Sequence, residues 1–400
     1  MHRFFRVMQI PINGTIIYLL AFSIYFISNS LAFTMFSYVI PSIVGTAIRA
    51  IVTGLIVFKM IEFDHFDYRM LIMYFSLLFL SILVAYRSGS KDIFFMMMLI
   101  LGAQGVSFRS IARLYLFLGT SVLALTVVSA QLGVIKNLVF YRGSTARFAL
   151  GTIYPTNLAA LTFYLMVCYC YLRNVALKAR EYLIMFVILC VMYYLTGTRL
   201  NVIISIGLLL VMVVYQRYQK NKSSQAELFL VNYSWLAMPI AFFSINWMSY
   251  IYSSTDKIQK MIDHLLSGRL GLGHFALTAY PQTLFGRFIE QNGWGGLNGV
   301  QPSPGFKYFF IDSSFVRLLA MYGIVFSIVT IGCFTYKARK LNQQNNVLIP
   351  LLLMVVAISS IVDANLLEIS LNPFLWIFFS NISNNKGLQQ RSYTSKANIT

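Results

Sequence analysis

Residues 14–33 read GTIIYLLAFSIYFISNSLAF, twenty residues in a row without one charged side chain. A helix that crosses the hydrocarbon core of a bilayer needs about 20 mostly apolar residues. This stretch is too long for the apolar region of a signal peptide, and no clear small-residue cleavage site follows it. We therefore interpret it as a first membrane-spanning helix that is retained.

Similar apolar runs recur along the chain and predict twelve spans. They cover residues 14–33, 42–60, 70–86, 93–108, 114–132, 152–172, 182–195, 201–215, 229–252, 313–336, 347–362 and 364–380. Of the 400 residues, 58% are hydrophobic and 11% are charged, whereas soluble proteins carry about 25% charged residues. This composition excludes a soluble enzyme, and we predict an all-α polytopic membrane protein with about twelve transmembrane helices.

The net charge of +19 comes from 31 Lys and Arg residues against 12 Asp and Glu residues. Part of such an excess is expected in the cytoplasmic loops of a membrane protein. With the N-terminus in the cytoplasm, every inner connection carries at least two cations, and the first and last outer turns carry none. We predict that both termini are cytoplasmic, and we expect no nucleic-acid partner.

These spans divide the chain into four regions. They are spans one to nine (1–252), a large extracytoplasmic loop (253–312), spans ten to twelve (313–380) and a cytoplasmic tail (381–400) that we expect to be disordered. In the loop, Ile258, Met261 and Leu265 share one helical face, which predicts an amphipathic helix in the membrane interface. Long loops in compact proteins usually carry function.

Five arginines lie at or near the expected outer ends of spans, where the positive-inside rule gives no reason for them. They are Arg142, Arg147, Arg199, Arg269 and Arg287. The planar guanidinium binds two phosphate oxygens at once and stays charged at any relevant pH. As a group they predict a site for a lipid-linked pyrophosphate. For any single arginine, the alternative is an interfacial anchor or a pair with Asp92, Asp256 or Glu290.

Arg49 is a sixth candidate for phosphate binding because it lies inside an apolar run, 45–58. At ~1.5 Å per residue it is about 12 Å from the expected outer end of its span. A charge at that depth costs about 2.5–3.5 kcal/mol on insertion scales, and its default interpretation is functional. The alternative is an interhelical pair with Asp363 or Glu368.

Two residues of the outer loop are candidates for proton transfer. Asp312, in Ile311–Phe315, is either a general base beside the arginines or a helix cap. His274 is the second candidate, although a lone histidine is more often a polar surface group. We expect no metal and no cofactor, because the four cysteines lie in apolar runs without ligand spacing and no P-loop motif is present.

Several segments together resemble the bacterial polysaccharide repeat-unit polymerases of the Wzy type, which are akin to the O-antigen ligases. The resemblance extends over roughly 141–323 and rests on four motifs in the expected order. They are Phe148–Ala160, Thr196-Gly197-Thr198-Arg199, Ser267-Gly268-Arg269 with Pro281 and Leu284-Phe285-Gly286, and Ile311–Phe315 with Leu318, Leu319, Tyr322 and Gly323. Ligases of this group often have His where Asp312 stands, which leaves the identity of the base open.

The resemblance implies that undecaprenyl-pyrophosphate-linked oligosaccharides serve as donor and acceptor at the outer face of the bacterial cytoplasmic membrane. An acceptor hydroxyl would attack the anomeric carbon, undecaprenyl pyrophosphate would leave, and the anomeric centre would invert. The product would be an exopolysaccharide, a capsule or an O-antigen. Asn157, Tyr280 and Trp294 are assigned to glycan binding. Expected partners are membrane lipid, a chain-length regulator and a flippase.

Three other functions remain open from sequence alone. A ligase hands finished glycan to a different acceptor and is poorly separated from a polymerase. A flippase for lipid-linked oligosaccharide would also have about twelve spans and basic residues, but such carriers are usually built from two repeated halves, and none is visible here. A non-catalytic structural protein would leave Arg49 and the outer arginines unexplained.

Overall fold

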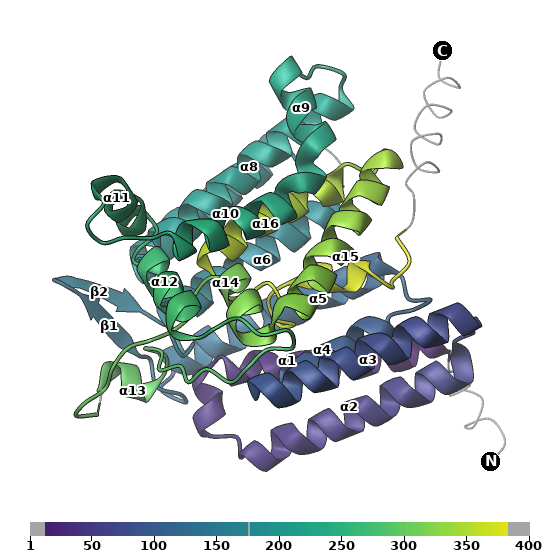
Figure 1. Cartoon of the computed structure of the whole chain (residues 1–400), viewed down its shortest axis with the longest axis horizontal. Coiled ribbons are helices and arrows are strands. Elements are labelled where there is room, and N and C mark those ends of the chain that lie inside the picture. Colours follow the sequence, from purple (N-terminus) through teal and green to yellow (C-terminus); the bar gives the residue numbers. More distant parts are fainter. Residues whose placement is uncertain (1–12, 175–176, 302, 383–400) are drawn as a thin grey trace.

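The computed structural model describes residues 13–174, 177–301 and 303–382, and most of them are helical (Figure 1). Within these ranges, eight helical segments are long and apolar enough to cross a membrane. They are α1 (Gly14–Ala32), α2 (Ser42–Phe63), α3 (Tyr68–Ser88), α5 (Phe108–Gln131), α6 (Pro155–Arg173), α7 (Ala179–Thr196), α8 (Arg199–Gln219) and Gln225–Tyr250. The last combines α9 (Gln225–Tyr233), η3 (Ser234–Leu236) and α10 (Ala237–Tyr250). The prediction of a helical membrane protein is confirmed at this level. Residues 383–400 of the expected tail lie outside the described residues.

The predicted fourth span is a short helix. α4 (Asp92–Gly102) has 11 residues and is about 16 Å long at ~1.5 Å per residue, too short for a hydrocarbon core of roughly 30 Å. The chain leaves the helix at Ala103, and Gly105 then adopts a positive φ of 75°. Almost every α4 side chain from Met96 onwards is buried. Its apolar character therefore reflects the protein core and not contact with lipid.

The predicted twelfth span, 364–380, is wrong as a helix. After α16 (Leu348–Val362) the chain forms turns and one short 3-10 helix, η5 (Pro373–Ile377). Asn372 begins η5 because its Oδ1 accepts a hydrogen bond from the backbone amide of Phe374. Its side-chain Nδ2 donates to Leu366 O. Trp376 is 0% exposed and packs edge-on against Phe22 of α1, with ring centroids 5.0 Å apart. Irregular backbone is tolerated at such a place because protein surrounds it.

The predicted tenth span is interrupted at Gly323. It consists of α14 (Ser314–Arg317), a π-helical turn η4 (Leu318–Tyr322) and α15 (Ile324–Gln343). Residues 283–287 of the large loop cross this break: the Arg287 amide donates to Met321 O, and the Ile324 amide donates to Thr283 O. A Cβ atom on Gly286 would lie 2.2 Å from Met321 O, so the close approach requires glycine there.

The connections that matter for the site gather at one end of the helices, which we call the hairpin end (left in Figure 1). The hairpin is an antiparallel pair, β1 (Val139–Arg142) and β2 (Thr145–Phe148), so the fold is not purely α-helical. The large loop adds α11 (Lys257–Leu265), α12 (Arg269–Ala279) and α13 (Leu297–Val300). The expected amphipathic helix is α11, whose Ile258, Met261 and Leu265 are all at least 60% exposed.

Candidate functional site

A cavity of about 640 Å³ opens at the hairpin end. We call it the arginine cavity and define it by Arg142, Arg147, Arg269, Asp312 and Asp363. These residues come from β1, β2, the start of α12, the end of the large loop and the chain just after α16. Segments far apart in sequence therefore place three predicted arginines and the predicted base around one space.

Arg147 is the most deeply placed of the three arginines, with 3% of its surface exposed. Its Nε donates to the backbone oxygen of Thr196, 2.6 Å away, and its guanidinium lies 5.6 Å from the centroid of the Tyr154 ring. Burial lowers the pKa of Arg147, and the positive charge of Arg142 lowers it further. Two cations share this wall without a carboxylate between them, an arrangement that an anionic ligand would stabilise.

Arg269 is the first residue of α12 and is held from several sides. Its Nε donates to Val362 O, its NH1 donates to Leu266 O at 3.1 Å, and its NH2 lies 4.0 Å from Asp363 Oδ1. Gly268 precedes it with φ of 83°, a left-handed conformation that favours glycine. The Ser267-Gly268-Arg269 motif is thus a turn that aims this guanidinium at the cavity.

Asp312 does not serve as the cap that was its alternative assignment. α14 begins at Ser314 with Ser313 at its N-cap, and Asp312 Oδ2 instead accepts a hydrogen bond from Tyr308 OH at 3.3 Å. Burial raises the pKa of Asp312, while Arg269 and Arg317 partly oppose the rise. A carboxylate in this setting is a stronger base than an exposed one.

Asp363 is a cavity residue that the sequence did not assign to the site. The Ser314 amide donates to Asp363 O at 3.2 Å, and Ser314 Oγ donates to the same oxygen, which fixes Asp363 beside Asp312. Burial raises the pKa of Asp363 to about 6, Arg269 lowers it, and Asp312 raises it. The available signal was an acid in an apolar C-terminal stretch whose other acid is Glu368.

Aromatic side chains line the mouth of the arginine cavity. Trp294 stacks on Tyr308 with ring centroids 5.5 Å apart and an interplanar angle of 15°, and the Phe306 ring is tilted against Trp294 at a centroid distance of 5.0 Å. Trp294 and Tyr308 both line the cavity. The structure therefore places Trp294, one of the three residues predicted to bind glycan, at the arginine cavity.

Six predicted residues are not among the described residues that line the arginine cavity; Arg49 lies in a second cavity, and the other five are placed as follows. Arg199 begins α8 and is exposed, and Asn157 lines a separate small apolar cavity. Arg287 donates to Pro281 O and lies over the Tyr280 ring, which itself stacks on Phe309. His274 is tied through Nδ1 to Ser249 O at 3.1 Å. The structure does not bring these five to the predicted base.

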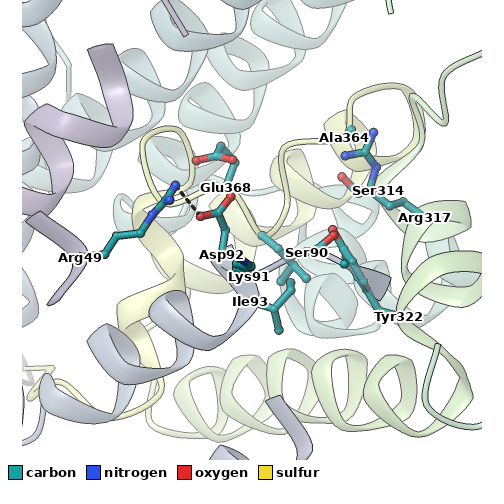
Figure 2. A pocket seen from close by; sticks show the side chains of 12 residues that line it. Arg49, Ser90, Lys91, Asp92, Ile93, Ser314, Arg317, Tyr322, Ala364 and Glu368 are labelled. Carbon is teal, nitrogen blue, oxygen red and sulfur yellow. Dashed lines mark ion pairs between the residues drawn. The ribbon is translucent and has the colours of Figure 1, made fainter. Parts of the chain in front are cut away.

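Arg49 lies in a second polar cavity, of about 450 Å³ (Figure 2). We call this the Arg49 cavity and define it by Arg49, Lys91, Asp92, Arg317 and Glu368. Arg49 NH2 lies 3.0 Å from Asp92 Oδ1, so its partner is neither Asp363 nor Glu368. The six arginines predicted to bind phosphate are therefore divided between two cavities and the protein surface.

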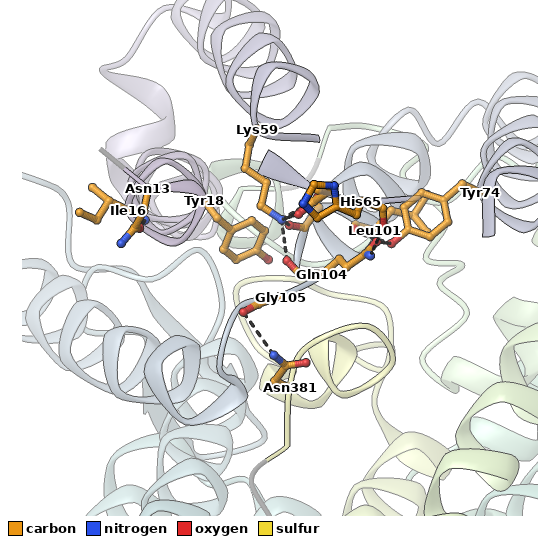
Figure 3. A network of polar contacts seen from close by, with 12 residues as sticks. Asn13, Ile16, Tyr18, Lys59, His65, Tyr74, Leu101, Gln104, Gly105 and Asn381 are labelled. Atoms are coloured by element: carbon orange, nitrogen blue, oxygen red, sulfur yellow. Dashed lines mark hydrogen bonds and ion pairs between the residues drawn. The ribbon is translucent and has the colours of Figure 1, made fainter. Parts of the chain in front are cut away.

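A buried ion pair at the opposite end of the helices has a structural role (Figure 3). Lys59 is 2% exposed, and its Nζ donates to both carboxylate oxygens of Asp64, at 2.6 and 2.7 Å. The same Nζ donates to Gly102 O and Gln104 O, where α4 ends. A cation at a helix C-terminus is favourable. These contacts bind the C-terminal end of α4 to Lys59 of α2, so we assign no ligand to this cluster.

In the described ranges, no group of three or more His, Cys, Asp and Glu side chains is arranged to hold a metal ion. Comparison with known proteins adds no relative: no family model matches the chain, and neither does any curated protein or solved structure. The function is therefore inferred from the geometry of the site and from the motifs in the sequence.

Proposed function

We propose that the protein is a glycosyltransferase of the bacterial cytoplasmic membrane that joins undecaprenyl-pyrophosphate-linked repeat units into a polysaccharide at the outer face. One observation carries the proposal: Arg142, Arg147 and Arg269 converge on the cavity that also holds Asp312. A volume of about 640 Å³ falls within the range of roughly 300–1,000 Å³ typical of ligand sites.

The three arginines would hold the donor pyrophosphate. Their charge is fixed at any relevant pH, and their fork geometry matches phosphate oxygens. Negative charge grows on the pyrophosphate as its bond to the sugar breaks, so preorganised guanidinium groups stabilise the transition state more than the ground state. Arg147 and Arg269 are suited to this because backbone oxygens already fix them.

Asp312 would act as the general base. An acceptor hydroxyl attacks the anomeric carbon of the donor sugar, the carbon–oxygen bond to pyrophosphate breaks, and the hydroxyl proton passes to the Asp312 carboxylate. One displacement inverts the anomeric centre. Asp363 would keep Arg269 in place through their 4.0 Å pair. Trp294 and Tyr308 would support the sugar next to the reacting carbon.

The experiment that tests this function is the lipid-linked glycan profile of a strain that lacks the protein. A polymerase predicts that single repeat units accumulate on undecaprenyl pyrophosphate in the outer leaflet. A ligase predicts that finished polymer accumulates on the lipid, and a flippase predicts that single units remain in the inner leaflet. Complementation with Arg147→Gln is expected to fail. The matched control is Lys136→Gln, which removes an exposed cation three residues before β1.

A further inference from the structure

The Arg49 cavity is built from parts that the proposed transfer step does not use. Its walls come from α2, from the turn before α4, from α14 with η4, and from residues 364–368 (Figure 2). Arg49, Lys91 and Arg317 contribute three positive charges, and Asp92 and Glu368 contribute two negative charges. With all five ionised the lining carries one net positive charge, three minus two.

These charged groups differ in how firmly protein partners hold them. The Arg317 guanidinium donates to Ile311 O and Gln291 Oε1, and Glu368 accepts from Asn29 Nδ2 and Ser370 Oγ. The Arg49–Asp92 pair is different because 36% of the Arg49 side chain and 64% of the Asp92 side chain are exposed. An exposed ion pair is worth little, so an anionic ligand can replace Asp92 at a small cost.

An apolar groove reaches the same arginine from the other side. It has a volume of about 460 Å³ and lies between α1 and the first turns of α2. Apolar side chains form most of its length, among them Ile24, Ile27, Leu31, Val44 and Ile48. Both helices are long and apolar enough to cross a membrane, so the groove faces the layer where lipid chains lie.

Arg49 lines both the polar cavity and the apolar groove. We propose that the two form one binding site for a lipid with a phosphate headgroup, whose headgroup binds Arg49 and Lys91 and whose chain lies in the groove. A free phosphate would leave the groove unused, and a lipid without a phosphate would leave the cations unused.

The second site adjoins the arginine cavity across a thin wall. Ser314 and Ala364 line the Arg49 cavity, whereas Asp312 and Asp363 line the arginine cavity. The wall is closed by the bond from the Ser314 amide to Asp363 O. Two residues of extended chain cover at most about 7 Å, so Asp312 lies within that distance of Ser314 on the wall of the Arg49 cavity. The second lipid is the acceptor, and this role alone rests on the proposed function.

Binding is tested with the full-length protein in dodecyl maltoside micelles, which contain no phosphate, titrated with undecaprenyl phosphate and followed by native mass spectrometry. We expect two lipids per wild-type chain, one in each cavity. Gly45→Leu should fill the groove, because Gly45 lines it and an added Cβ atom has no neighbour within 4 Å. We expect it to weaken one of the two binding events about ten-fold, equivalent to roughly 1.4 kcal/mol.

The control is Gly54→Leu on the same helix, where an added Cβ atom also has no neighbour within 4 Å but the groove is absent. It should leave both binding events intact. Arg49→Gln should weaken the same event as Gly45→Leu, while Arg269→Gln should weaken the other. Gly45→Leu leaves the Arg49–Asp92 pair intact. It therefore still tests the groove if Arg49→Gln does not fold.

Two results would overturn the second site: one lipid per wild-type chain whose binding Gly45→Leu leaves unchanged, or two lipids of unchanged affinity in both Gly45→Leu and Arg49→Gln. Loss in Arg49→Gln together with full binding in Gly45→Leu would exclude the lipid chain from the groove and so reject the proposal as stated. If Arg269→Gln keeps both events while Gly45→Leu loses one, the second site stands and the proposed role of the arginine cavity fails. The two proposals therefore fail separately.

Discussion

Arg147 donates from Nε to the backbone oxygen of Thr196, 2.6 Å away, across 49 residues of sequence. Thr196 is the last residue of α7, and a helix C-terminus carries partial negative charge that favours a nearby guanidinium. The contact holds the hairpin against the turn at Gly197 and Thr198. The Thr196–Arg199 motif thus contributes to the arginine cavity through a carbonyl group, and Arg199 itself lies outside.

The first prediction concerns Gly197. This residue has φ of 59°, and an added Cβ atom would lie 3.4 Å from both Cγ and Nε of Arg147. Relief of the strain at this left-handed position would shift the turn whose Thr196 carbonyl holds Arg147, so we expect Gly197→Ala to reduce polymer yield, as measured by gel profiles of the glycan. The left-handed backbone alone costs roughly 1–2 kcal/mol. Gly133→Ala is the control for backbone strain without a contact to Arg147, since Gly133 has φ of 75° and open space around it. Equal polymer yield in the two variants would contradict the prediction.

The second prediction compares two arginines of the resembling motifs. Arg269 lines the cavity and is fixed by Leu266 O and Asp363, whereas Arg199 is exposed outside the cavity. We expect Arg269→Ala to abolish chain extension with single lipid-linked units retained, and Arg199→Ala to extend chains nearly as the wild type does. Protein levels are measured in parallel by immunoblot. Loss of extension in Arg199→Ala at normal protein level would restore the interpretation made from the sequence.

The third prediction is a pH dependence of stability that comes from Asp363. Burial raises its pKa to about 6, whereas an unfolded aspartate titrates near 3.9. Between these values the folded state binds more protons than the unfolded state, so the free energy of unfolding falls as pH rises from about 4 to about 6. The shift corresponds to roughly 3 kcal/mol at most. Asp312 contributes with the same sign because its pKa is also raised.

Thermal denaturation midpoints of the detergent-solubilised protein between pH 4 and pH 7 measure this dependence. Asp363→Asn is expected to weaken this dependence. In the variant, the midpoint at pH 7 should fall less below the midpoint at pH 4 than it does in the wild type. Glu290→Gln serves as the control because Glu290 is an exposed acid of the large loop. An unchanged slope in Asp363→Asn would show that the folded protein does not retain a proton at this carboxyl group.

The apolar runs predicted most of the helices, because run length alone decides whether a helix reaches across a bilayer. Four of the twelve predicted spans are not among the eight segments able to cross a membrane: α4, the interrupted segment 313–336, α16, which has 15 residues, and 364–380. In α4 and 364–380 most of the apolar side chains are buried against other protein elements, and hydropathy does not distinguish a lipid neighbour from a protein neighbour. Asn372 and Pro373 carried the only local signal against a helix in the last segment, since the asparagine caps η5.

The candidate site was predictable as a class of residues and not as a set of contacts. Arginines at outer ends of helices indicated an anion site, and three of six line the arginine cavity with Asp312. The hairpin that carries Arg142 and Arg147 determines which side chains meet, and its pairing lies within a loop. Asp363 was missed because its place depends on Ser314, 49 residues earlier in the chain.

The last prediction tests Asp312 as a general base. Asparagine keeps the size of aspartate and can still accept the hydrogen bond from Tyr308 OH, but it cannot accept the proton of a sugar hydroxyl. We expect Asp312→Asn to lower the transfer rate by about 10²–10⁴-fold, the usual contribution of a general base. Undecaprenyl phosphate should bind this variant as tightly as the wild type, since the arginines remain. Near-normal polymer from Asp312→Asn would reduce Asp312 to a structural residue. Because burial raises the pKa of Asp312, we also expect the wild-type transfer rate to decline as pH falls through that raised value, and any residual rate of Asp312→Asn to lack this decline.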